Sequence, residues 1–172
     1  MTNGSMAVVM SLMLVVLVAV PPAAAQDRPS PALEFAAGAL LFADNGVVPE
    51  RFAGGAGRGY ISPRISVGPE ISVVSGQGHS HFIATGNVAI DLVSALEGRR
   101  RTLTPFVVAG AGVFRTSEES PYSSFSSTEG SFTAGAGIRA RIGERAFVGG
   151  EARLGWEAHF RLSGFVGVDL RR

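Results

Sequence analysis

The chain has 172 residues, a formal net charge of +1 and no cysteine. This length fits a single domain. The near-neutral charge gives no electrostatic ground for nucleic-acid binding, and the lack of cysteine excludes disulfides and thiolate chemistry. Only 17% of the residues are charged, and 23 glycines exceed the average share for a globular protein.

The N-terminal segment is typical of an export signal. Residues 6–20 form the only long apolar run, and two prolines follow it. Ala23 and Ala25 have the spacing that a signal peptidase recognises, which predicts cleavage between Ala25 and Gln26. A transmembrane anchor is the alternative, but the run is short for a membrane span. The predicted organisation is a signal peptide at 1–25, a linker at 26–32 and a β-barrel domain at 33–172.

Five strands are predicted next, at 33–43, 52–61, 65–75, 82–92 and 104–115. In the first, either face could point inward, and the second is mostly glycine and alanine. The third and fourth alternate between apolar and polar residues, as strands with one apolar face do. Pro69 interrupts the third, and because proline cannot donate a ladder hydrogen bond we expect a bulge at Gly68-Pro69. The fifth is apolar on both faces.

The last forty residues alternate most clearly. Strands are predicted at 131–142, 146–156 and 159–170. In the first of these, Phe132 and Ile138 lie on one face while Arg139 and Arg141 lie on the other. Each segment has about ten residues, the length that a tilted strand needs to cross a bilayer.

The fold class predicted by these segments is all-β, an eight-stranded antiparallel up-and-down transmembrane β-barrel. Closure of eight strands removes the exposed sheet edges. The long polar segment 116–130 would be an outer loop, and the short turns at 62–64 and 142–145 would face the periplasm. The long connection near 93–102 and the short outer turn at 157–158 depart from this pattern.

From Pro63 onward the chain resembles the small outer-membrane β-barrel proteins of Gram-negative bacteria, of the OmpA/OmpX-like kind. The resemblance is carried by the segments SPRISVGPEIS, TPFVVAGAGVF, SFTAGAGIRARI and FVGGEARLGW. It implies an outer-membrane location and contact with outer-membrane lipid. Members usually end in an aromatic residue, whereas Leu170 holds the last apolar position here.

Eight charged residues fall on the predicted inward faces. Side chains fill the interior of so small a barrel, and an unpaired charge there would cost several kcal/mol. We therefore expect a structural ion-pair plug and favour it over a gated polar pathway. The predicted network comprises Glu70, Asp91, Arg139, Arg141, Glu151, Arg153, Arg161 and Asp169.

Aromatic and glycine residues have structural interpretations. Tyr60, Trp156 and Phe160 lie near strand ends, which predicts a membrane girdle. The strand glycines follow no phosphate-loop motif, and we expect them to relieve crowding between strands and interior side chains. These are Gly135, Gly137, Gly149 and Gly150.

No catalytic, cofactor or metal site is predicted. His79 and His81 lack a further histidine or cysteine nearby in sequence, which favours a solvated loop over a metal site. A hydrolase would need serine, histidine and carboxylate within hydrogen-bonding reach. His159 and Ser163 are interpreted as sharing neither a strand face nor a motif.

The predicted function is therefore non-enzymatic. We expect an exported outer-membrane barrel with a structural or surface-interaction role that presents loops 44–51, 76–81 and 116–130 outward. The expected partners are outer-membrane lipid and extracellular molecules that bind loops 44–51 and 116–130. The alternative is a soluble periplasmic or secreted lipocalin-like barrel that binds a small apolar ligand. The two differ in which face of the barrel is apolar.

Overall fold

The computed structural model describes residues 30–43, 47–76, 79–93, 103–120, 123–156 and 159–170. The predicted signal peptide and residues 26–29 of the predicted linker lie outside these ranges. Within them, no helix has the length and apolar character that crossing a membrane would require.

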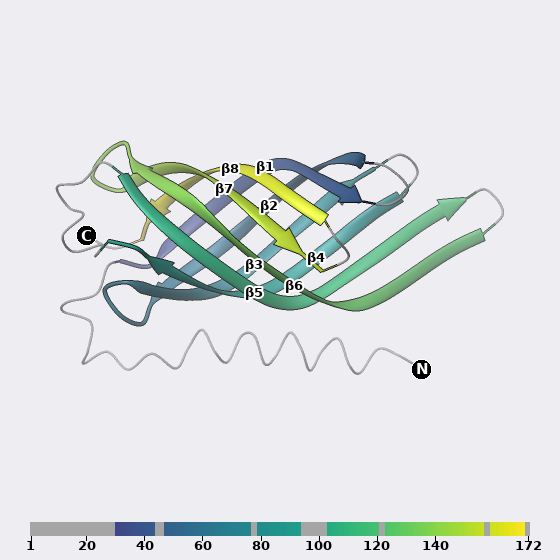
Figure 1. Cartoon of the computed structure of the whole chain (residues 1–172), viewed down its shortest axis with the longest axis horizontal. Coiled ribbons are helices and arrows are strands. Elements are labelled where there is room, and N and C mark those ends of the chain that lie inside the picture. The colour runs from purple at the N-terminus through teal and green to yellow at the C-terminus, as the bar shows by residue number, and fades with distance from the viewer. Residues whose placement is uncertain are drawn as a thin grey trace.

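The described residues form eight antiparallel strands that close into a barrel, each strand pairing with the next and β8 pairing with β1 (Figure 1). The predicted fold class is therefore confirmed. The strands are β1 (Ala32–Ala43), β2 (Val47–Tyr60), β3 (Ile65–Ser75), β4 (His79–Asp91), β5 (Leu103–Ser120), β6 (Ser123–Arg141), β7 (Ala146–Gly155) and β8 (His159–Asp169).

The apolar faces of the strands point outward. Leu154 is 67% exposed, whereas its neighbour Arg153 is 3% exposed. Ile138 is likewise exposed, and Glu151 is buried. Alternation along a strand produces this separation directly. The lipocalin-like alternative is wrong, because it requires apolar side chains inside and charges outside.

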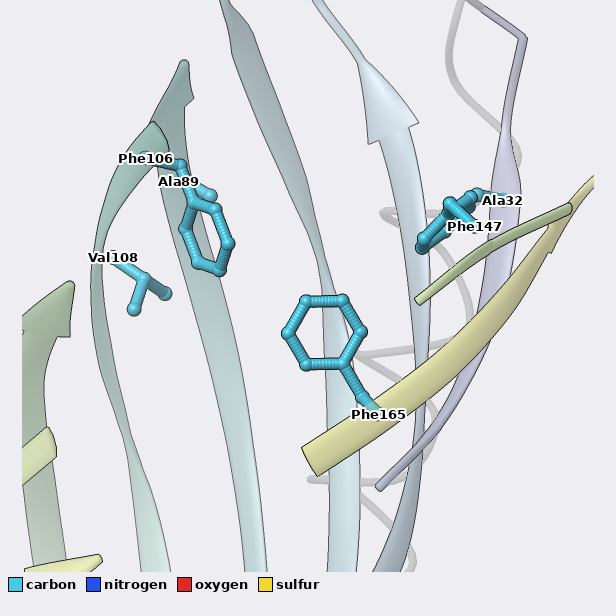
Figure 2. Packing of buried hydrophobic residues seen from close by; sticks show 6 residues of the cluster. All are labelled: Ala32, Ala89, Phe106, Val108, Phe147 and Phe165. Carbon is cyan, nitrogen blue, oxygen red and sulfur yellow. The ribbon is translucent and has the colours of Figure 1, made fainter. Parts of the chain in front are cut away.

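Two apolar clusters pack inside the barrel between its charged layers. The first comprises Ala32, Ala89, Phe106, Val108, Phe147 and Phe165 (Figure 2). The second comprises Leu40, Phe52, Val74, Ile83 and Phe114. Leu40 shows that β1 turns its even-numbered residues inward, which the sequence pattern left open. The interior is therefore filled with side chains, as expected for eight strands.

Gly137 makes room for this packing, because a Cβ there would lie 2.5 Å from Cζ of Phe106. The crowding expected at Gly150 is absent: its nearest neighbour would be the carbonyl oxygen of Ser163 at an ordinary 3.5 Å. Gly150 faces outward with Ala152 and Leu154, away from the interior side chains.

The bulge predicted at Gly68-Pro69 is wrong. Ala56 pairs with Glu70 and Gly59 pairs with Val67 in the same register, so no residue is inserted between them. The proline ring lies against Gly57, where a Cβ would be 3.8 Å from Cδ of Pro69. β3 therefore keeps the same register with β2 and with β4 on both sides of Pro69.

The three predicted outer loops are mainly strand. The β2 strand begins at Val47 and β4 begins at His79. β5 and β6 remain paired to Ser120 and Ser123, so segment 116–130 is a hairpin that extends past the neighbouring strands (Figure 1). Its serines and glutamates predicted a loop by their polarity, but cross-strand hydrogen bonds hold it as a two-stranded ribbon. The end of the barrel that carries it is called the hairpin end below.

Candidate functional site

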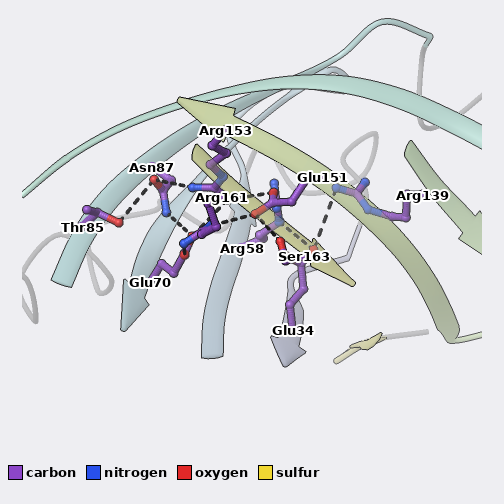
Figure 3. Close-up of polar contacts among 10 residues, drawn as sticks. All are labelled: Glu34, Arg58, Glu70, Thr85, Asn87, Arg139, Glu151, Arg153, Arg161 and Ser163. Atoms are coloured by element: carbon purple, nitrogen blue, oxygen red, sulfur yellow. Dashed lines mark hydrogen bonds and ion pairs between the residues drawn. The ribbon is translucent and has the colours of Figure 1, made fainter. Parts of the chain in front are cut away.

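Four charged side chains form a closed ring in the middle of the barrel (Figure 3). Arg153 Nη2 lies 3.0 Å from Glu70 and 2.9 Å from Glu151. Arg161 lies 2.6 Å from Glu151 and also contacts Glu70. The two cations and two anions alternate, so the ring of Glu70, Glu151, Arg153 and Arg161, called the central ring below, carries no net charge.

Neutral side chains complete the central ring. Asn87 Nδ2 donates to Glu70 at 2.9 Å, and Ser163 Oγ donates to Glu151 at 3.3 Å. The Arg161 guanidinium lies over the Phe52 ring, 5.1 Å from its centroid. Buried charges are tolerated when they are paired and hydrogen-bonded in this way.

A second cluster lies toward the end of the barrel that carries Ser30 and Leu170. Arg58 Nε is 2.6 Å from Glu34, and Arg139 lies 3.5 Å from Asp91 and 3.9 Å from Glu34. Tyr60 joins these residues: its hydroxyl donates to Asp91 at 3.2 Å and accepts from Arg139 at 3.1 Å. The cluster again balances two acids with two arginines.

The structure brings six of the eight predicted network residues into these two clusters. The other two, Arg141 and Asp169, form a separate pair at 2.8 Å, and the Arg141 side chain is 39% exposed at the rim. Sequence reasoning missed Glu34 and Arg58. A usable signal existed, since a charge on a strand with a lipid-facing side must point inward.

Two of the three predicted girdle aromatics lie on the outer surface of the barrel, and the third lies inside it. Trp156 is 57% exposed and packs against Phe132, with ring centroids 5.5 Å apart. Phe160 lies on the outward face of β8 between Leu41 and Leu154. The girdle position predicted for Tyr60 is wrong, because its hydroxyl is held by the interior charges.

A third polar group lies inside the hairpin end. Glu50, from the start of β2, contacts both His79 and His81 of β4. The prediction that these histidines lie in a loop is wrong, because β4 begins at His79 and carries both histidines on its inward face. Glu50 was missed because the sequence pattern placed it in a loop.

The histidine and serine considered for a hydrolase site do not come within hydrogen-bonding distance of each other. His159 and Ser163 do share the inward face of β8, contrary to the prediction, because they are four positions apart on the strand. That separation corresponds to about 13 Å along a strand. His159 Nδ1 lies 2.7 Å from the Trp156 carbonyl oxygen, and Ser163 bonds Glu151, so the two side chains do not bond each other.

Comparison with known proteins agrees with this architecture. Residues 10–167 match the family described as "Outer membrane protein beta-barrel domain". No curated protein matches the chain.

Solved structures share the fold at low sequence identity. Neisserial surface protein A superposes with a TM-score of 0.71 at 10% identity, covering 81% of this chain and 97% of that one. The N-terminal barrel domain of Pseudomonas aeruginosa OprF gives 0.62 at 13%, covering 83% and 100%. Ail, the attachment invasion locus protein of Yersinia pestis, gives 0.56 at 10%, covering 83% and 97%.

These matches support an outer-membrane location and a lipid environment, in line with the exposed apolar faces of the strands. Since the family match extends over most of the chain, and the described residues form a closed barrel with its charges inside, the chain belongs to the outer membrane protein beta-barrel domain family.

Proposed function

We propose that this protein is a plugged, non-conducting barrel of the outer membrane whose β5–β6 hairpin presents an interaction surface outside the cell. The observation that carries the proposal is the extension of this hairpin past its neighbours. The signal peptide would be removed after Ala25 on export, which predicts a mature protein that begins at Gln26, as measured by intact mass.

The central ring supports a plugged lumen. The cavity beside it, lined in part by Glu34, Glu70, Glu151 and Arg153, has a volume of about 10 Å³. This is about the space that one water molecule needs. A hydrated ion would have to separate the paired charges to pass, so we expect no steady conductance.

The hairpin supports a surface role because one edge of it pairs with no other strand in the described part of the chain. Among the described residues, Ser123–Ser131 pair with β5 alone, and pairing with β7 starts at Thr133. The Phe132 carbonyl accepts a hydrogen bond from the Trp156 amide at 2.9 Å, on the β7 side. By alternation, the even-numbered residues of β6 direct their backbone groups toward this open edge.

An open edge can bind an extended peptide as an additional strand. Segment 116–130 contains three glutamates and no lysine or arginine, and Phe125 on it is 61% exposed. Ail has been solved with the heparin analogue sucrose octasulfate. The acidic hairpin here does not suit a polyanion, so the proposed partner is an extended, neutral or basic protein segment.

Cysteine labelling tests the orientation of the barrel. The chain has no cysteine, so Ser126→Cys on the hairpin and Glu144→Cys in the β6–β7 turn each provide a single exposed thiol. We expect a membrane-impermeant maleimide to label intact cells carrying Ser126→Cys and to label Glu144→Cys only after lysis. The reverse pattern would refute the outward placement of the hairpin.

Edge binding has its own test. Ser126→Pro removes a backbone donor from the open edge and leaves the β5 ladder intact, whereas Ser126→Thr keeps that donor. Peptides selected from a random library on the barrel in nanodiscs should lose binding to the proline variant and keep it with threonine. Equal binding to both variants would exclude recognition through this edge.

A further inference from the structure

Two histidines and a glutamate converge inside the hairpin end of the barrel. His79 and His81 are two residues apart on β4, so both point inward. Glu50 reaches them from β2, across the end of β3. One ligand atom from each of the three residues lies within 4.8 Å of the others.

The surroundings hold the three residues close together and orient them. β3 ends at Ser75, and the following Gly76 packs against the site, since a Cβ there would lie 2.5 Å from Glu50 Oε1. His81 Nδ1 lies 3.0 Å from Thr116 Oγ1, which directs Nε2 of the same ring toward Glu50. Fixing one imidazole nitrogen in this way sets the orientation of a metal-binding histidine.

The charge balance at Glu50 differs from that of the other interior acids. Glu34, Glu70, Asp91 and Glu151 each contact an arginine. Among the buried carboxylates of the described ranges, Glu50 alone has only histidines as cationic partners. Its Oε2 makes no hydrogen bond within the described part of the chain, although its side chain is 3% exposed. A buried carboxylate is costly unless a positive charge accompanies it.

The geometry suits a divalent transition metal. Two imidazoles and one carboxylate form a donor set that binds Zn²⁺, with the fourth position left to water or another ligand. His81 Nε2 and Glu50 Oε2 are 3.4 Å apart, whereas His79 Nε2 contacts Glu50 Oε1 directly and would have to move away from it to bind the same ion. Two ligand atoms at tetrahedral Zn²⁺ bond lengths of about 2.0–2.1 Å are separated by about 3.4 Å.

We propose that Glu50, His79 and His81 bind one divalent transition-metal ion, best matched by Zn²⁺, inside the hairpin end of the barrel. The site draws its ligands from β2 and β4, which are not neighbours in the sheet. Metal binding would therefore link the two strands across the opening and neutralise the buried carboxylate.

Calorimetric titration of the untagged protein with ZnCl₂, in detergent micelles at neutral pH, tests the proposal. We expect one Zn²⁺ per chain. Glu50→Gln and His81→Ala should each weaken Zn²⁺ binding at least tenfold. His159→Gln is the matched control, because His159 is the remaining histidine of the chain and bonds the Trp156 carbonyl. The Zn²⁺ affinity of this variant should equal that of the unmodified protein.

Cobalt spectroscopy distinguishes a variant that has lost a metal ligand from a variant that has failed to fold. Co²⁺ bound by the unmodified protein should give the intense visible absorption of tetrahedral coordination, and Glu50→Gln should abolish it. The folded state of this variant is checked by comparing its gel mobility before and after heating, because a folded barrel is expected to migrate differently from the heat-unfolded chain. Absence of one-to-one Zn²⁺ binding, or an equal loss in His159→Gln, would overturn the proposal.

Discussion

Removing one charge from the central ring should destabilise the barrel far more than removing a balanced pair. Glu151→Met leaves Arg153 and Arg161 facing Glu70 alone. The two lost contacts, at 2.9 and 2.6 Å, are each worth about 4 kcal/mol if the charge centres are about 4 Å apart and the effective dielectric constant is about 20. After relaxation, we expect a loss of about 3–5 kcal/mol in the free energy of unfolding.

Arg161→Met should cost a similar amount, because it leaves two carboxylates with one guanidinium. The double variant Glu151→Met with Arg161→Met keeps the Arg153–Glu70 pair, at 3.0 Å, and should cost only about 0–2 kcal/mol. The double variant is therefore expected to be more stable than either single variant.

Urea unfolding in micelles measures these differences. Trp156 is the only tryptophan and lies on the outer surface, so its fluorescence reports insertion. Arg141→Met is the control: it breaks the exposed rim pair with Asp169 and should cost less than about 1 kcal/mol. If the loss of unfolding free energy in the double variant equalled the sum of the losses in the two single variants, the central ring would not act as a coupled unit.

Three further experiments test packing, lipid contact and assembly. Gly137→Ala places a methyl group against Phe106 and should cost about 1–3 kcal/mol in urea unfolding, whereas Gly150→Ala should be near neutral; equal effects would contradict the packing. Val166→Arg puts a charge on the lipid-facing surface and should cost about 2–4 kcal/mol in vesicles, and no loss would mean that this face does not meet lipid. Leu170→Phe places an aromatic residue at the last apolar position, before Arg171, and should speed insertion in cells, as measured by pulse-chase gel mobility; an unchanged rate would mean that an aromatic residue at this position is not an insertion signal.

The sequence predicted the strands and their inward faces best where large apolar residues alternate with charges. In β6 and β8, Arg139 and Arg161 oppose bulky apolar residues, so only one orientation keeps charge away from lipid. In β1, apolar residues occupy both faces, so the hydrophobic pattern does not fix the orientation of the strand, and only the charge of Glu34 indicates which face points inward. Its partner Arg58 lies in the glycine-rich β2, where the pattern carries little information.

Contacts between distant strands could not be predicted from spacing. Glu50 and His81 are 31 positions apart and meet because the β2–β3 and β3–β4 registers bring both to the hairpin end. Pro69 was expected to produce a bulge, yet the register of β3 with β2 and β4 is the same on both sides of it. The long hairpin was missed because polar composition does not distinguish a paired ribbon from a loop.

The most direct test of the account is which side chains touch lipid. The interior and exterior carry chemically matched methyl groups: Leu40 and Val74 are 0% exposed, whereas Leu154 and Val166 are 67% and 55% exposed. In a methyl-labelled protein in nanodiscs, NMR should show cross-relaxation from lipid acyl chains to Leu154 and Val166 and none to Leu40 and Val74. Contacts to Leu40 and Val74 in place of Leu154 and Val166 would contradict the account.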